Sequence, residues 1–138
     1  MKNRHLSYWI PTALFALAMT MSGLGALTRQ APMVAGYTHL GYPVYFMTIL
    51  GAAKLLGVAA LLAPGLPRLK EWAYAGFTIN LASAALSHLA AGDPVGNVVP
   101  VVALLGILFT SWHFRPVSRS LVSPAADVPS GHPVVATA

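Results

Sequence analysis

Residues 40–64 read LGYPVYFMTILGAAKLLGVAALLAP, and this stretch decides the fold. Between Pro43 and Ala63 the only charged side chain is that of Lys54. At a helical rise of about 1.5 Å per residue, this apolar run is long enough to cross the ~30 Å hydrocarbon core of a bilayer. A lysine at mid-depth costs roughly 2.5–3.5 kcal/mol on insertion scales, so we expect Lys54 to face other helices or a wet cavity. The stretch therefore predicts a membrane helix that needs neighbouring helices.

The composition of the whole chain agrees with a protein embedded in a lipid bilayer. Of its 138 residues, 57% are hydrophobic and only 8% are charged, whereas about a quarter of a soluble domain is charged. The mean hydropathy is +0.68. The apolar runs have the length of membrane helices rather than of alternating barrel strands, so we expect an all-α fold.

The chain contains further runs of the same kind, separated by turn signals. The linker at residues 28–42 contains Pro32, after which we expect a short interfacial helix. A basic start followed by an apolar run also fits a signal peptide, but more apolar runs follow. We therefore predict a four-helix transmembrane bundle with spans at residues 8–27, 43–63, 72–91 and 95–114.

The basic residues predict the orientation of this bundle. The chain carries eight lysines and arginines and a net charge of +5. All of them except Lys54 and Arg29 flank the ends of spans that lie on one side, so we read them as topology signals and expect no nucleic acid. This pattern predicts that both termini are cytoplasmic. We expect residues 1–115 to form the membrane domain and the proline-rich residues 116–138 to form a disordered cytoplasmic tail.

The candidate binding site centres on Lys54. Lys54 and Asn80 lie near the middle of two antiparallel spans, so we expect the ammonium to donate a hydrogen bond to the Asn80 oxygen. Gly76, Asn80, Ser83 and Ser87 follow the spacing of one helix face. One hypothesis is that Lys54, Asn80, Ser83 and Ser87 bind a carboxylate, a quinone carbonyl or a lipid headgroup. The other is that Lys54 is a structural lysine held by polar neighbours.

A second polar cluster is expected on the outer side of the membrane. His39 and Asp93 fall in the two outer connections, and His88 lies near the outer end of the third span. There, two imidazoles and a carboxylate offer an acceptable transition-metal set. Their spacing matches no metal motif, so we assign no metal and favour a role in capping or fixing loops. Glu71 is expected in the first turn of the third span, where a carboxylate favours the helix N-terminus.

Several stretches in the second and third spans resemble those of a known family. They are LGYP at residues 40–43, GAAKLLG at 51–57, PRLKEWAYAGF at 67–77 and SHLAAGD at 87–93. Together they are similar to the DoxX-like family of small four-helix integral membrane proteins of bacteria, over about residues 8–114. The resemblance implies the bacterial cytoplasmic (inner) membrane. It also implies a link to quinone-reducing systems, since the family is named after a component of one.

The sequence contains no pattern for a catalytic site. It has no cysteine, and it lacks paired carboxylates, a Ser/His/Asp order and a dinucleotide glycine motif. We therefore expect no cofactor and lean against an enzyme. Our leading hypothesis is a non-catalytic accessory subunit or a binder of a small lipophilic ligand, beside a membrane redox partner. The alternatives are a small proton-coupled transporter, which would need homo-oligomerisation, and a membrane component of a quinone-linked oxidoreductase complex.

Overall fold

The computed structural model describes residues 2–121, and this part of the chain is all-α. The prediction of an all-α fold is therefore confirmed. The short helix expected after the first span is present and begins one residue before Pro32. The elements are α1 (Lys2–Leu27), α2 (Ala31–His39), α3 (Val44–Leu62), α4 (Pro67–Ala90), α5 (Val95–His113) and a short 3-10 helix, η1 (Val117–Arg119).

Within the described residues, three helices are long and apolar enough to cross a membrane. They are His5–Leu27 in α1, Val44–Leu62 and Val95–His113. The predicted third span corresponds to α4, which has 24 residues but is less apolar because it carries Asn80, Ser83, Ser87 and His88. Length and composition alone therefore support three of the four predicted crossings.

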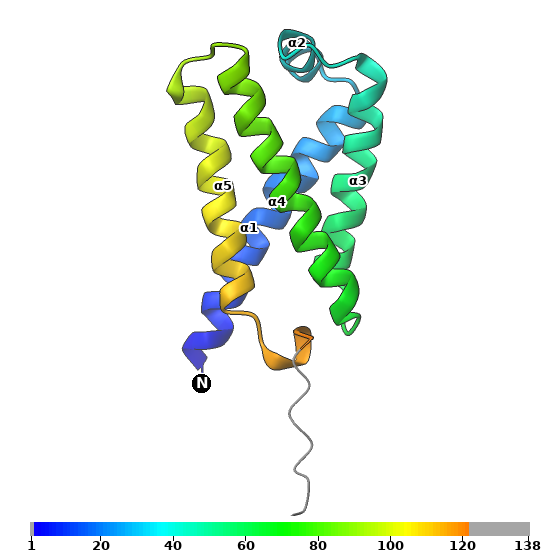
Figure 1. Ribbon diagram of the computed structural model, residues 1–138. Helices are drawn as coiled ribbons and strands as arrows, with labels where there is room; N and C mark the ends of the chain where they lie inside the picture. The colour runs from blue at the N-terminus through cyan, green and yellow to red at the C-terminus, as the bar shows by residue number, and fades with distance from the viewer. Residues whose placement is uncertain (1, 122–138) are drawn as a thin grey trace, which may run out of the picture.

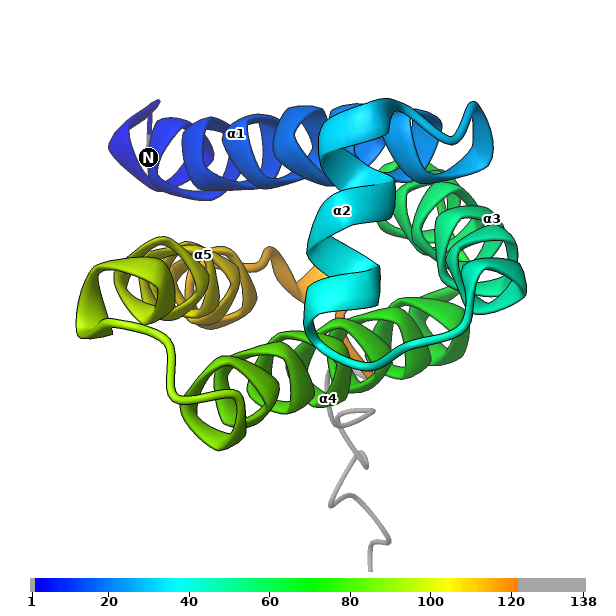
Figure 2. The ribbon, with the colours of Figure 1, turned by 90° about the horizontal axis from the view of Figure 1, so that it is seen from above.

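The four long helices form a closed ring. α1 and α4 each pack against α3 and α5, so α1 and α4 occupy opposite corners (Figure 1). α2 lies across one end of this ring, over the space that the long helices surround (Figure 2). We call this the α2 end, and we call the opposite end, where η1 lies, the η1 end.

The buried core joins all four long helices. The rings of Phe15 and Phe77 meet edge to face, with 5.0 Å between their centroids. A chain of buried hydroxyl groups adds polar contacts between helices: Ser111 Oγ lies 2.6 Å from Thr12 Oγ1 and 2.8 Å from Tyr74 Oη. The same hydrophobic cluster also contains Ala16, Met19, Val58, Leu61, Leu81 and Leu108.

Basic side chains fix the η1 end. Lys70 is fully buried, and its amine donates hydrogen bonds to the carbonyl oxygens of Ala60, at 3.0 Å, and Ala63. Arg119 donates to the carbonyl oxygen of Leu61 at 3.2 Å. The last carbonyl groups of a helix have no partner within the helix, so these two cations cap the C-terminus of α3.

The structure changes the expectations about this end. Lys70, one of the basic residues that flank the spans, is a buried helix cap. Glu71 lies beyond the first turn of α4, because that helix already begins at Pro67, and it forms an ion pair with Arg115. The first residues of the segment expected to be a disordered tail form η1, which packs against α4. Residues 122–138 lie outside the described part of the chain.

Candidate functional site

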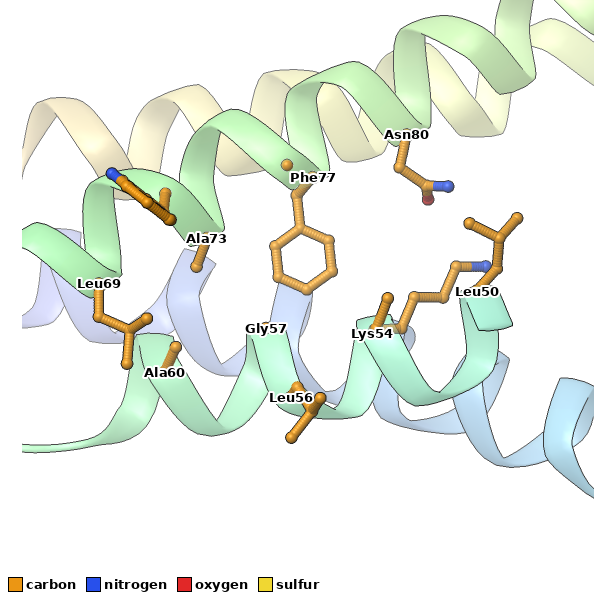
Figure 3. Close-up of a pocket in the computed structure, with 12 residues that line it drawn as sticks. Leu50, Lys54, Leu56, Gly57, Ala60, Leu69, Ala73, Phe77 and Asn80 are labelled. Carbon is orange, nitrogen blue, oxygen red and sulfur yellow. The ribbon is translucent and has the colours of Figure 1, made fainter. Parts of the chain in front are cut away.

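Two adjoining cavities lie between α3 and α4. The first, of about 530 Å³, lies beneath α2 and is lined by residues of α2, the α2–α3 loop, α3 and α4. We call it the α2-side cavity. The second, of about 290 Å³, lies between α3 and α4 and extends toward the η1 end (Figure 3). We call it the α3–α4 groove. Both are lined by Leu50, Lys54, Gly76 and Asn80.

Lys54 supplies the positive charge where the two cavities meet. Its side chain is half-buried, and its amine donates a hydrogen bond to Ser22 Oγ of α1 at 2.9 Å. The expected hydrogen bond from Lys54 to Asn80 is not formed among the described residues. The two side chains instead line the same space, with the Asn80 carboxamide and the Lys54 amine on the same side of the Phe77 ring (Figure 3).

The close crossing of α1 and α3 explains why Ser22 is the partner. A Cβ atom added to Gly51 would lie 2.9 Å from the carbonyl oxygen of Gly23, and one added to Gly23 would lie 3.1 Å from that of Gly51. Glycines allow two membrane helices to approach this closely. Ser22 precedes Gly23, and Lys54 follows Gly51 by one helical turn, so the crossing brings their side chains together.

The contact between α3 and α4 is open beside Gly76 and tight at Gly57. A Cβ atom on Gly76 would meet no atom within 4 Å, whereas one on Gly57 would lie 2.7 Å from the Phe77 ring. The Phe77 ring therefore fits against the bare backbone of α3 and fills the interface at that level. Next to it, the small side of α4 around Gly76 leaves the space that both cavities share.

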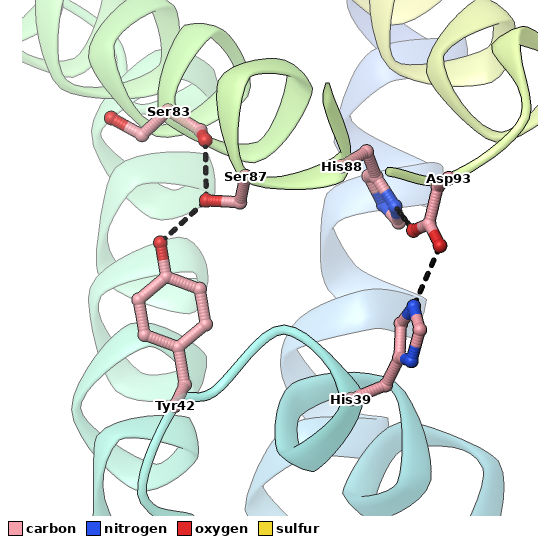
Figure 4. Close-up of polar contacts among 6 residues, drawn as sticks. All are labelled: His39, Tyr42, Ser83, Ser87, His88 and Asp93. Atoms are coloured by element: carbon pink, nitrogen blue, oxygen red, sulfur yellow. Dashed lines mark hydrogen bonds and ion pairs between the residues drawn. The ribbon is translucent and has the colours of Figure 1, made fainter. Parts of the chain in front are cut away.

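The second polar cluster closes the α2 end. The imidazoles of His39 and His88 each lie 2.6 Å from a different carboxylate oxygen of Asp93 (Figure 4). These hydrogen bonds, first that from His88 and then that from His39, hold the pKa of the Asp93 carboxyl below its usual value. The cluster joins the end of α2 to the end of α4, as the hypothesis of a loop-fixing role requires.

A second contact closes the same end. The Ser87 hydroxyl donates to the carbonyl oxygen of Ser83 at 2.8 Å, so the Tyr42 hydroxyl is the donor to Ser87 at 2.7 Å (Figure 4). Tyr42 also lines the α2-side cavity. This contact attaches the loop between α2 and α3 to α4.

The structure places the predicted site residues in two groups. Lys54, Asn80 and Ser83 line the α2-side cavity, while Ser87 holds Tyr42. His39, His88 and Asp93 meet as described, and no group of three or more His, Cys, Asp or Glu side chains within residues 2–121 is arranged to hold a metal ion. Sequence reasoning missed the side chains that α1, α2 and the α2–α3 loop contribute, which are Ser22, Met33, Tyr37 and Tyr42.

Comparison with known proteins gives one match. The model of the DoxX-like family matches residues 10–110, which include α2, α3 and α4 and thus both cavities. No curated protein and no solved structure matches the chain.

Proposed function

The chain belongs to the DoxX-like family, and we propose that it is a multi-pass membrane protein that binds a small lipophilic ligand without catalysing a reaction. The observation that carries this proposal is the pair of cavities that meet at Lys54 and Asn80. Binding sites for small molecules are usually concave and mostly apolar, with a few polar groups that fix the ligand. Lys54, Asn80 and Ser83 are such groups in this site.

The surface of α4 supports a fourth membrane crossing. It carries large exposed apolar side chains: Trp72, Ile79 and Leu86 are at least 66% exposed. Asn80 and Ser83, by contrast, line the cavities. A helix that turns its polar residues inward and its apolar residues outward suits lipid, because charged and polar groups in a membrane face the bundle interior. With the basic flanks on one side, we place both termini in the cytoplasm of a bacterial cell and the bundle in its inner membrane.

The α3–α4 groove offers an entrance from the bilayer. Leu56 and Trp72, which both line it, are 73% and 79% exposed. Since these side chains face the surrounding lipid in the proposed orientation, a lipophilic molecule can enter between them without crossing water.

The contacts at the α2 end favour binding over transport. A carrier must open its site to each side of the membrane in turn, whereas the His39–Asp93–His88 cluster and the Tyr42–Ser87 contact close the α2 end. We therefore place the protein as an accessory subunit that holds its ligand for a membrane redox partner, in keeping with the quinone-linked system after which the family is named.

The small molecules that copurify with the protein provide the test. We expect mass spectrometry of extracts from wild-type protein in nanodiscs to show a lipophilic compound that is depleted at least tenfold in Lys54→Met. Gly76→Leu should deplete it as well, because the new side chain fills the space shared by both cavities. Gly106→Leu is the matched control, since a Cβ atom there also meets no atom within 4 Å and the position lines neither cavity. Identical extracts from all four proteins would refute the proposal.

A further inference from the structure

We propose that the ligand is a single-chain carboxylic acid whose carboxylate pairs with Lys54 and whose alkyl chain lies in the α3–α4 groove. This inference rests on the proposed function and adds the charge and the shape of the ligand. It follows from three features: the carboxylates of the chain, the depth of Lys54 and the polar groups beside it.

Within residues 2–121, no carboxylate is free to pair with Lys54. It contains only three acidic residues, Glu71, Asp93 and Asp127. Glu71 is paired with Arg115, and Asp93 is paired with His39 and His88 at the α2 end. Asp127 lies outside the described residues.

An unpaired ammonium within a membrane is unfavourable. A buried charge is normally compensated by an opposite charge and by hydrogen bonds. Within the described residues, the Lys54 amine makes one hydrogen bond, to the neutral Ser22 hydroxyl, although it has three donors. A molecule that enters the cavities can supply the missing negative charge.

The position of Lys54 selects a free acid over a phospholipid. Lys54 lies in the middle of α3, so its anionic partner must reach the middle of the bilayer. Phospholipid headgroups remain at the membrane surface, whereas one carboxylate on a single chain is small enough to enter the bundle. Asn80 is placed to complete its recognition, because its carboxamide makes no hydrogen bond among the described residues and lines both cavities. The Asn80 NH₂ group and the Lys54 amine together can donate to both carboxylate oxygens.

The groove fits the alkyl chain. Beyond Lys54 and Asn80, its lining residues are apolar, and its mouth at Leu56 and Trp72 opens to the lipid. A chain longer than the groove can continue through this mouth among the acyl chains of the bilayer. The ligand would then have its acid group inside the protein and its tail pointing out.

The charge of the ligand can be tested without changing the protein. Dodecanoate and dodecanol have the same chain length and differ in the head group, and both can be titrated at pH 8 into full-length protein in phosphatidylcholine nanodiscs, with binding read by native mass spectrometry. We expect dodecanoate to bind wild type at least tenfold more tightly than dodecanol, which corresponds to about 1.4 kcal/mol. Lys54→Met should remove this difference, and Lys54→Arg should retain most of it.

The possible outcomes separate the two proposals. If both compounds bind equally and Gly76→Leu weakens both, the site holds a lipophile but the inferred carboxylate is wrong. If Gly76→Leu and Lys54→Met change the affinity for neither dodecanoate nor dodecanol, the proposed function fails as well. If phosphatidylglycerol in the nanodisc displaces dodecanoate as effectively as excess dodecanoate does, the site takes a lipid headgroup and the free acid is excluded.

Discussion

The two sides of α3 differ in how closely they are packed. On the side of α1, Gly23 and Gly51 bring the two backbones so close that an added Cβ atom would lie 2.9 Å from a carbonyl oxygen. On the side of α4, an added Cβ atom at Gly76 would meet no atom within 4 Å. Glycine therefore has opposite effects at Gly51 and Gly76: at Gly51 it allows α1 and α3 to pack closely, and at Gly76 it leaves space between α3 and α4.

Lys54 connects these two sides. Its amine is held by Ser22 on the closely packed side, and its side chain lines the cavities on the open side. The close crossing with α1 thus holds the Lys54 amine beside the cavities, where the proposed ligand would bind. The predictions below test whether stability depends mainly on the first side and binding on the second.

The largest expected effect comes from making the same substitution, glycine to leucine, on each side of α3. Gly51→Leu should lower the free energy of unfolding by about 3 kcal/mol, the upper part of the usual range for overpacking, because the side chain collides with the backbone of α1. Gly76→Leu should leave stability close to that of the Gly106→Leu control while abolishing ligand binding. Unfolding titrations in denaturing detergent measure the first quantity. If Gly51→Leu and Gly76→Leu are equally stable, the two sides of α3 do not differ in how closely they are packed.

A smaller effect is expected at Gly57, where α3 and α4 are in close contact. Gly57→Ala should lower stability by about 1 kcal/mol, because the new methyl group would lie 2.7 Å from the Phe77 ring and the ring must shift. The same titration measures this change. In the double variant Gly57→Ala/Phe77→Leu, the Gly57→Ala substitution should no longer be destabilising relative to Phe77→Leu alone. If its cost is the same with and without the ring, the contact with Phe77 is not its cause.

A still smaller effect is expected at the partner of Lys54. Ser22→Ala should cost about 0.6 kcal/mol of stability, the average measured for hydrogen bonds between membrane helices. Binding of dodecanoate should become more sensitive to the substitution Asn80→Ala in this background, because the lysine is then positioned less firmly. A Ser22→Ala variant that loses as much stability as Gly51→Leu would show that the hydrogen bond, and not the helix crossing, holds α1 to α3.

The smallest effect on stability is expected at the α2 end. Asp93→Asn replaces the carboxylate that holds His39 and His88 with a weaker acceptor. We expect faster amide hydrogen exchange in α2, at Ala31–His39, and unchanged exchange in the middle of α3. Because its folded-state pKa is lowered, the contribution of Asp93 to stability is present above its ordinary pKa and is lost as the pH falls through the folded-state value. Protection of α2, measured relative to intrinsic exchange at each pH, should therefore fall in wild type at acid pH and fall no further in Asp93→Asn.

Much of the fold could be predicted from the sequence because run length and turn residues act locally. The apolar run around Lys54 predicts α3, and the polar stripe from Gly76 to Ser87 predicts the face of α4 that lines the site. The meeting of His39, His88 and Asp93 follows from the connections that carry them.

The contacts that were missed depend on how distant helices cross. No spacing links Ser22 to Lys54, which are 32 residues apart. The signal that bears on this contact is the pair Gly23 and Gly51, small residues of the kind found where membrane helices approach closely. Lys70 was predicted only as one of the basic residues that flank the spans, because its burial depends on the three-dimensional position of the α3 C-terminus.

The position of the ligand can be measured directly with a single thiol. The chain contains no cysteine, so the thiol introduced by Gly76→Cys is the only site for N-ethylmaleimide, and it lies where the two cavities meet. We predict that saturating dodecanoate slows its alkylation at least tenfold in protein with Lys54 and has no effect when Lys54→Met is added. Alkylation at the same rate with and without dodecanoate, in protein that retains Lys54, would contradict the proposed site.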